Sequence, residues 1–141
     1  MLIHTVFEHC WYVFQGSKSC YSIHANFASQ DVAKILCRNR GGHLVYIETI
    51  EEFDELREFI IQNYDANAQY SGLLWTGLEK AGDNWYWGNG KQYSLPTIKW
   101  EPGYFLGDCL MIAHRGSGSM GPLFRQAECI MRRNFMCEYE Y

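Results

Sequence analysis

The sequence predicts a single α+β domain, in which two helices pack on antiparallel sheets, with a long irregular loop and three disulfide bonds. Two segments with helical periodicity come first, and after residue 63 the apolar residues change to the alternation typical of strands. The chain contains six cysteines, an even number with no two in a C-x-x-C pair. Its 141 residues suit one domain (1–141), and nothing in the composition divides it.

The N-terminal third is expected to form an aromatic hairpin followed by a helix. The hairpin covers residues 10–23 and turns at Gly16 and Ser17. The helix covers residues 27–38 and ends before Gly41 and Gly42, because glycine favours helix termination. Its apolar positions recur at helical spacing: Ala28, Val32, Ile35 and Leu36.

A short strand over residues 43–47 precedes the second helix, which Thr49 opens. Thr49 and Glu52 have the spacing of a capping box, in which each side chain accepts a hydrogen bond from a free backbone amide. One face of this helix is apolar and should pack inward: Phe53, Leu56 and Ile60. The other face is acidic, since residues 48–58 contain six carboxylates and one arginine, and we expect it to be solvated.

The rest of the chain is expected to be strands and loops. The apolar pattern predicts strands over residues 73–78, 85–87, 108–113 and 134–138. Glycine and asparagine mark turns at residues 82–84 and 88–90. Residues 91–107 contain Pro96 and Pro102 without periodicity, which indicates a long irregular loop, and residues 115–122 form a flexible turn.

The cysteines favour a disulfide framework and therefore an extracellular protein, either secreted or the ectodomain of a membrane receptor. Six reduced thiols in the core are the alternative, because free cysteine is often buried. Residues 1–10 contain neither a full hydrophobic region nor a small-residue cleavage site, so we expect a mature protein or an excised ectodomain. No apolar run approaches the roughly 18–20 residues that span a bilayer.

Several function classes are disfavoured by the composition. The net charge of −4 gives no general case for binding nucleic acid. The five histidines have no H-E-x-x-H spacing, and no G-x-S-x-G sequence occurs, so an enzyme is not expected. No cofactor is expected either.

The order of the cysteines and tryptophans resembles the C-type lectin-like domain in its long form, which has an N-terminal hairpin. The resemblance covers residues 10–138 and implies that fold. It is carried by Cys10-Trp11, Ser19-Cys20-Tyr21, the helix ending in Cys37, Gly41-Gly42-His43-Leu44-Val45, Trp75-Thr76-Gly77-Leu78, residues 85–90, Trp100, Asp108-Cys109, Cys129 and Phe135-Met136-Cys137-Glu138.

The resemblance also implies a disulfide pattern: Cys10–Cys20, Cys37–Cys137 and Cys109–Cys129. No cysteine is left over, so a disulfide-linked dimer is not indicated, whereas a non-covalent dimer stays possible.

In sugar-binding members of the family, a calcium ion in the long loop ligates sugar hydroxyls. Such an ion needs several oxygen ligands, and this chain departs from the family's set. Residues 100–103 lack the asparagine or aspartate of the usual triplet, and Gly107 stands where the family has a glutamate. Residues 124–126 replace the family's Trp-Asn-Asp. At most Glu101 is left, so no metal is expected there.

The resemblance therefore implies a non-catalytic recognition domain that binds a protein partner without calcium. Aromatic, methionine and arginine side chains dominate such interfaces. The candidate binding residues are Tyr104, Phe105, Arg115, Met120, Phe124 and Arg125. For Phe105 and Phe124 the alternative is packing in the space left by the shortened loop.

The second hypothesis is a calcium-independent lectin for glycans on a cell surface, with anionic or sulfated glycans as the candidate ligands. Residues 110–136 contain four arginines and one glutamate, and guanidinium groups suit sulfate or carboxylate. A solvated turn is the alternative for Arg132 and Arg133. We also expect Arg125 to substitute for the lost cation by pairing with Glu101 or Asp108.

Overall fold

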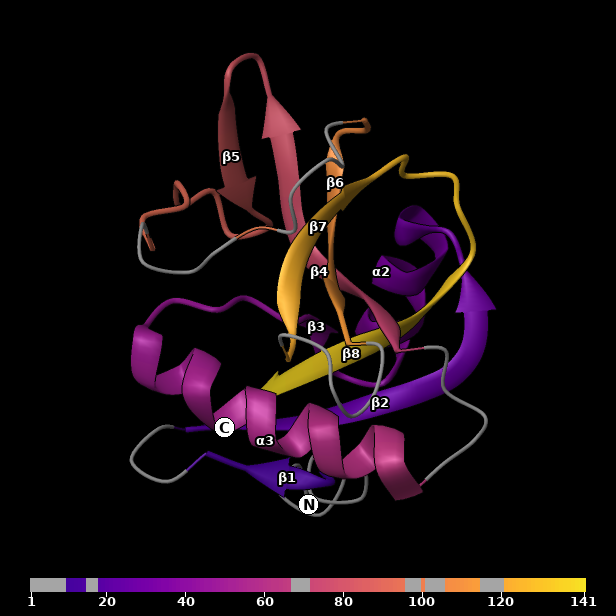
Figure 1. Cartoon of the computed structure of the whole chain (residues 1–141), viewed down its shortest axis with the longest axis vertical. Coiled ribbons are helices and arrows are strands. Elements are labelled where there is room, and N and C mark those ends of the chain that lie inside the picture. The colour runs from indigo at the N-terminus through magenta and orange to yellow at the C-terminus, as the bar shows by residue number, and fades with distance from the viewer. Residues whose placement is uncertain (1–9, 15–17, 67–71, 96–99, 101–105, 115–120) are drawn as a thin grey trace.

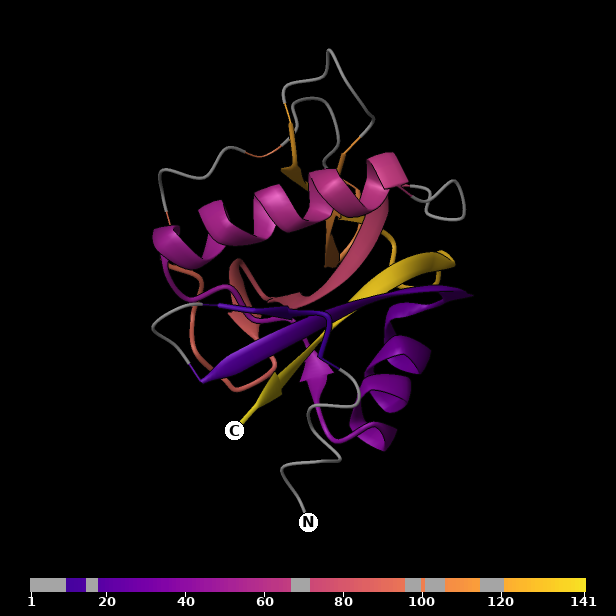
Figure 2. The same ribbon diagram turned by 90° about the horizontal axis from the view of Figure 1, so that it is seen from below.

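A computed structural model describes residues 10–14, 18–66, 72–95, 100, 106–114 and 121–141 (Figures 1 and 2). The strands are β1 (Tyr12–Val13), β2 (Ser19–Ala28), β3 (His43–Leu44), β4 (Leu73–Ala81), β5 (Asn84–Trp87), β6 (Cys109–Ala113), β7 (Leu123–Ala127) and β8 (Arg133–Glu140). The helices are α2 (Gln30–Asn39) and α3 (Ile50–Ala66). In the described part of the chain, no helix is long and apolar enough to cross a membrane.

The strands form one sheet in the order β1-β2-β8-β4-β6-β7, with β3 on β8 and β5 on β4. Every pair is antiparallel except β4 and β8, which run parallel. The expected antiparallel pairing therefore holds for every pair but one, and the sheet is mixed because β8 joins the two antiparallel halves through one parallel contact with β4. The helices lie on opposite sides of β2 and β8 (Figure 2).

The buried residues divide into two clusters. One lies under α3 and includes Phe53, Leu56 and Ile60, the inward face expected from the sequence. The other lies between α2 and the sheet and includes Trp75, whose indole donates to the carbonyl of Ala28 at 2.9 Å. Each helix thus covers its own part of the sheet.

Helix α2 begins later than predicted. Residues 27 and 28 still belong to β2, where Ala28 pairs with Arg133. Ser29 caps the helix, because its hydroxyl accepts a hydrogen bond from the amide of Val32 at 3.3 Å. Since tertiary pairing extends the strand, the first apolar residues of the expected helix lie in the sheet.

The buried face of α2 also differs from the prediction. Val32 and Ile35 are exposed, whereas Gln30, Ala33 and Cys37 are buried. Gln30 donates to the carbonyl of Thr76 at 3.0 Å, and Cys37 is bonded to β8. These two attachments fix the rotation of the helix, so the apolar spacing does not decide which side packs.

Three disulfide bonds join the elements, and they are the pairs that the resemblance implies. Cys10–Cys20 closes the N-terminal hairpin, and Cys109–Cys129 joins β6 to the β7–β8 connection. Cys37–Cys137 joins α2 to β8 over a separation of 100 residues. The alternative of six reduced thiols is excluded in this structure.

The predicted strands after residue 63 are confirmed, with ends that differ by a few residues. The sequence analysis missed β7, which pairs with β6 at the edge of the sheet. The strand expected over residues 43–47 is only two residues long, in β3.

Candidate functional site

Of the six residues predicted to bind a partner, the structure describes Phe124 and Arg125. Tyr104, Phe105, Arg115 and Met120 lie outside the described residues. Phe124 and Arg125 are neighbours in β7 and therefore point to opposite faces of the sheet.

Phe124 is completely buried, so its assignment to an exposed binding surface is wrong. Its ring makes edge contacts with Phe53 of α3 at 5.3 Å and with Tyr93 and Trp100 at 6.0 Å, measured between ring centroids. The alternative given above, that this phenylalanine fills space beneath the shortened loop, describes its environment. It joins α3, β7 and the residues after β5 in one aromatic cluster.

Gly107 occupies the position where the resemblance places a calcium-ligating glutamate. Its φ of +103° is strained for other residues, and a Cβ atom there would lie 2.1 Å from the carbonyl carbon and oxygen of Ala127. The side-chain amide of Gln126 donates to the carbonyl of Gly107 at 3.2 Å. The backbone of β7 therefore closes over this position, and a glutamate side chain does not fit.

Arg125 is half-buried and lies opposite Met111 of β6, whereas Asp108 is exposed. Glu101, its other expected partner, lies outside the described residues, so the ion pair stays a prediction. Arg132 is exposed, and Arg133 belongs to β8, which β4 and β6 separate from β7 in the sheet. The arginines of residues 110–136 that the structure describes are therefore not side by side on neighbouring strands.

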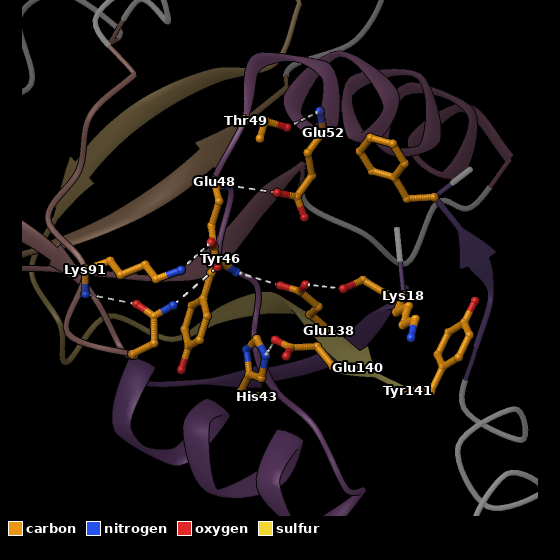
Figure 3. Close-up of a pocket in the computed structure, with 13 residues that line it drawn as sticks. Lys18, His43, Tyr46, Glu48, Thr49, Glu52, Lys91, Glu138, Glu140 and Tyr141 are labelled. Atoms are coloured by element: carbon orange, nitrogen blue, oxygen red, sulfur yellow. Dashed lines mark hydrogen bonds and ion pairs between the residues drawn. The ribbon is translucent and has the colours of Figure 1, made fainter. Parts of the chain in front are cut away.

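A separate cleft of about 840 Å³ lies at the other end of the molecule. Its walls come from β2, β3, the start of α3, the turn after β5 and the end of β8 (Figure 3). It is lined by Phe14, Lys18, Ser19, His43, Tyr46, Glu48, Thr49, Glu52, Asn89, Lys91, Glu138, Glu140 and Tyr141. The lining includes four carboxyl groups and two lysines.

Glu138 lies at the base of the cleft and is 4% exposed. Its carboxylate accepts hydrogen bonds from the hydroxyl of Ser19 at 2.7 Å and from the amide of Tyr46 at 3.0 Å. Burial, reinforced by the carboxylate of Glu52, raises the pKa of Glu138 from 4.5 to about 8. These hydrogen bonds fix the orientation of a carboxyl group that desolvation would otherwise make costly.

Glu52 is the second buried carboxylate, although the sequence analysis placed it on a solvated face. Its amide donates to the hydroxyl of Thr49 at 3.1 Å, as expected for a capping box. Its carboxylate accepts from the amide of Glu48 at 2.8 Å and from the hydroxyl of Tyr21. Burial raises the pKa of Glu52. The residue is buried because it caps the helix and also binds β2.

His43 and Glu140 form the rim of the cleft toward the C-terminus. The Nε2 atom of His43 lies 2.7 Å from a carboxylate oxygen of Glu140, and the ring stacks on Tyr46 with centroids 3.9 Å apart. On the opposite rim, Lys91 forms an ion pair with Glu48 at 3.1 Å (Figure 3). Such a cleft can bind cations and groups that donate hydrogen bonds.

The sequence analysis did not identify this cleft, although it quoted residues 41–45 and 135–138 as family motifs. It also missed Leu106, which is 78% exposed beside the long loop.

One serine–histidine contact occurs elsewhere, between the hydroxyl of Ser22 and Nε2 of His24 at 2.7 Å. Ser22 has no exposed surface, so this contact belongs to the packing of β2.

The sequence matches the Lectin C-type domain family over residues 26–139. A snaclec anticoagulant protein of Deinagkistrodon acutus is 28% identical over 135 residues, which cover 94% of this chain and 76% of the snaclec. Human C-type lectin domain family 4 member C is 30% identical over 133 residues, covering 91% of this chain and 57% of the human protein. The C-type lectin domain of murine dendritic cell inhibitory receptor 2, crystallised with an N-glycan, is 25% identical with a TM-score of 0.70, covering 88% and 92% of the two chains.

Proposed function

This chain belongs to the C-type lectin domain family, and on that premise we propose that it is an extracellular recognition domain that binds a protein partner without calcium. Its relatives support a non-catalytic recognition role. Three disulfide bonds suit a secreted protein or a receptor ectodomain, because such bonds persist in oxidising compartments.

The observation that carries calcium independence is the contact between β7 and Gly107. The backbone of Ala127 and Glu128 occupies the space that a glutamate side chain would need. The Gln126 side chain binds the Gly107 carbonyl, so a hydrogen bond holds two segments together where the family uses an ion.

Leu106 supports a protein partner. It is 78% exposed, and it continues a run in which the sequence places Tyr104 and Phe105. Burying an exposed leucine side chain against a partner is favourable, because it removes apolar surface from water. We therefore propose that Leu106 contributes to the partner-binding surface.

A binding screen tests this proposal. The domain would be displayed as a multimer and tested against arrayed cell-surface proteins and a glycan array, in millimolar calcium and in EDTA. We expect saturable binding to a protein in both buffers. Binding confined to glycans, or lost in EDTA, would overturn the proposal.

Matched variants locate the surface. Leu106→Ser should weaken partner binding by roughly tenfold or more, because burying a leucine side chain contributes about 1.5–3 kcal/mol. Ile35→Ser, on the exposed side of α2, removes a comparable apolar side chain and should leave binding unchanged. Equal effects of the two variants would contradict the proposed position.

Carbohydrate binding is the second candidate, since residues 110–136 carry a net positive charge and a relative was crystallised with an N-glycan. Electrostatic recognition of an anionic glycan would weaken strongly between low and high salt.

Light scattering on the unliganded domain tests for a non-covalent dimer.

A further inference from the structure

Three potential metal ligands meet on one side of the cleft. His43 of β3 pairs directly with Glu138 of β8, and Glu140 follows two residues later on the same face of that strand. One ligand atom from each side chain lies within 4.8 Å of the others. In a tetrahedral zinc site, with ligand atoms about 2.0–2.2 Å from the metal, neighbouring ligand atoms lie about 3.4 Å apart. Small side-chain rotations would therefore bring these three atoms onto one ion.

Both ring nitrogens of His43 contact oxygen atoms that hold the ring in place. Its Nδ1 atom lies 2.7 Å from the carbonyl oxygen of Leu44, which can only accept, so Nδ1 carries a proton. Its Nε2 atom faces a carboxylate oxygen of Glu140 at 2.7 Å.

The surroundings hold these ligands in place. The ring of His43 stacks on Tyr46, and its Nδ1 contact with Leu44 has the form of the outer hydrogen bond typical of metal-bound histidine. Glu138 is oriented by Ser19 and by the amide of Tyr46. The site opens into the cleft, so water can complete the coordination (Figure 3).

We propose that His43, Glu138 and Glu140 bind one divalent transition-metal ion, with zinc as the best match. Imidazole nitrogen with carboxylate oxygen is a ligand set that suits zinc, copper and nickel. Calcium fits it poorly, because calcium takes six to eight oxygen ligands. The site is separate from the Gly107 region and independent of the proposed partner-binding surface.

Titration calorimetry on the whole chain, stripped with EDTA and dialysed, tests the site with zinc chloride alone as the probe. We expect one zinc ion per chain. Cobalt(II) should give the visible absorption of a nitrogen- and oxygen-ligated ion, and millimolar calcium should not displace either metal. No heat with zinc at concentrations up to about a hundred times that of the protein would overturn the proposal.

Four variants separate this site from a general acidic cleft. His43→Ala and Glu140→Gln should each weaken zinc binding by roughly tenfold or more. Glu48→Gln removes a cleft carboxylate that pairs with Lys91 and should leave zinc binding unchanged. Glu52→Gln should also retain zinc binding. An equal loss of zinc affinity in all four variants would show that the ion responds only to the total charge of the cleft, which would contradict the proposal.

Unfolding in EDTA shows whether each variant is folded. Glu140 is exposed, so Glu140→Gln reports on metal binding even if His43→Ala proves unstable. Zinc binding by a folded Glu140→Gln protein at wild-type affinity would contradict the assignment.

Discussion

Replacing Phe124 by alanine should destabilise the domain strongly, because the side chain is fully buried among aromatic rings. Phenylalanine-to-alanine changes in cores cost about 3–5 kcal/mol. The edge contacts with Phe53, Tyr93 and Trp100 add to the transfer free energy of the ring, since such pairs contribute about 0.5–1.5 kcal/mol each. We expect a loss of about 4–5 kcal/mol in the free energy of unfolding, a large part of the roughly 5–15 kcal/mol typical of a domain.

Urea unfolding followed by tryptophan fluorescence measures this loss. The midpoint should fall while the slope stays close to that of the wild type, because the same surface is exposed on unfolding. Hydrogen exchange should also increase in α3 and β7, since the ring joins these elements.

Phe27→Ala is the matched control, because Phe27 is 50% exposed at the end of β2. It should change the free energy of unfolding by no more than about 0.5 kcal/mol. A loss below about 1 kcal/mol for Phe124→Ala, together with lost partner binding, would refute the core assignment and return Phe124 to the binding surface.

Three further outcomes are expected. Removing the Cys37–Cys137 disulfide by alanine substitutions should lower the free energy of unfolding by about 4.7 kcal/mol, against about 3.3 kcal/mol for Cys109–Cys129. The first disulfide closes a loop of 100 residues and the second a loop of 20. Equal losses in denaturant unfolding would contradict the loop-entropy argument. The raised pKa of Glu138, about 8 against 4.5, should make the fold most stable below pH 4.5 with respect to this group. Stability should then fall by up to about 1.4 kcal/mol per unit as the pH rises toward 8, and a Glu138→Gln protein in EDTA that kept this slope would assign it to other groups. Millimolar calcium should leave the melting temperature unchanged, and a rise of several degrees would reveal an unrecognised calcium site.

The parts of the fold that local patterns determine could be predicted from the sequence. The α3 face was correct because Phe53, Leu56 and Ile60 repeat with the helical period and all pack inward. The boundary of α2 was wrong, although Ser29 is a good N-cap residue, because the preceding residues extend β2 by pairing with β8. Strand β7 was missed because it contains only five residues with no regular alternation: two are buried, and the other three are half-buried.

The cleft could not be predicted from local pattern, because its walls come from segments that are far apart in the sequence. Glu52 is buried through contacts with Tyr21, and Glu138 through contacts with Ser19 and the backbone of residue 46. The sequence of an acidic helix face does not indicate which carboxylate will accept a hydrogen bond from a tyrosine of a distant strand. Two partial signals were present, the family motifs at residues 41–45 and 135–138 and the capping box of Thr49 and Glu52, and none of them indicated a cleft.

The disulfide pattern has a mechanical consequence. A pulling force on the two ends of the chain would pass from Cys10 directly to Cys20, along residues 20–37, and across to Cys137. The loop that the Cys37–Cys137 disulfide closes contains α3 and strands β3 to β7, and it lies outside this line of tension. Stretching the molecule would therefore load β2, α2 and the end of β8. Strands β4 to β7 would carry no covalent tension while the domain bears load between its ends.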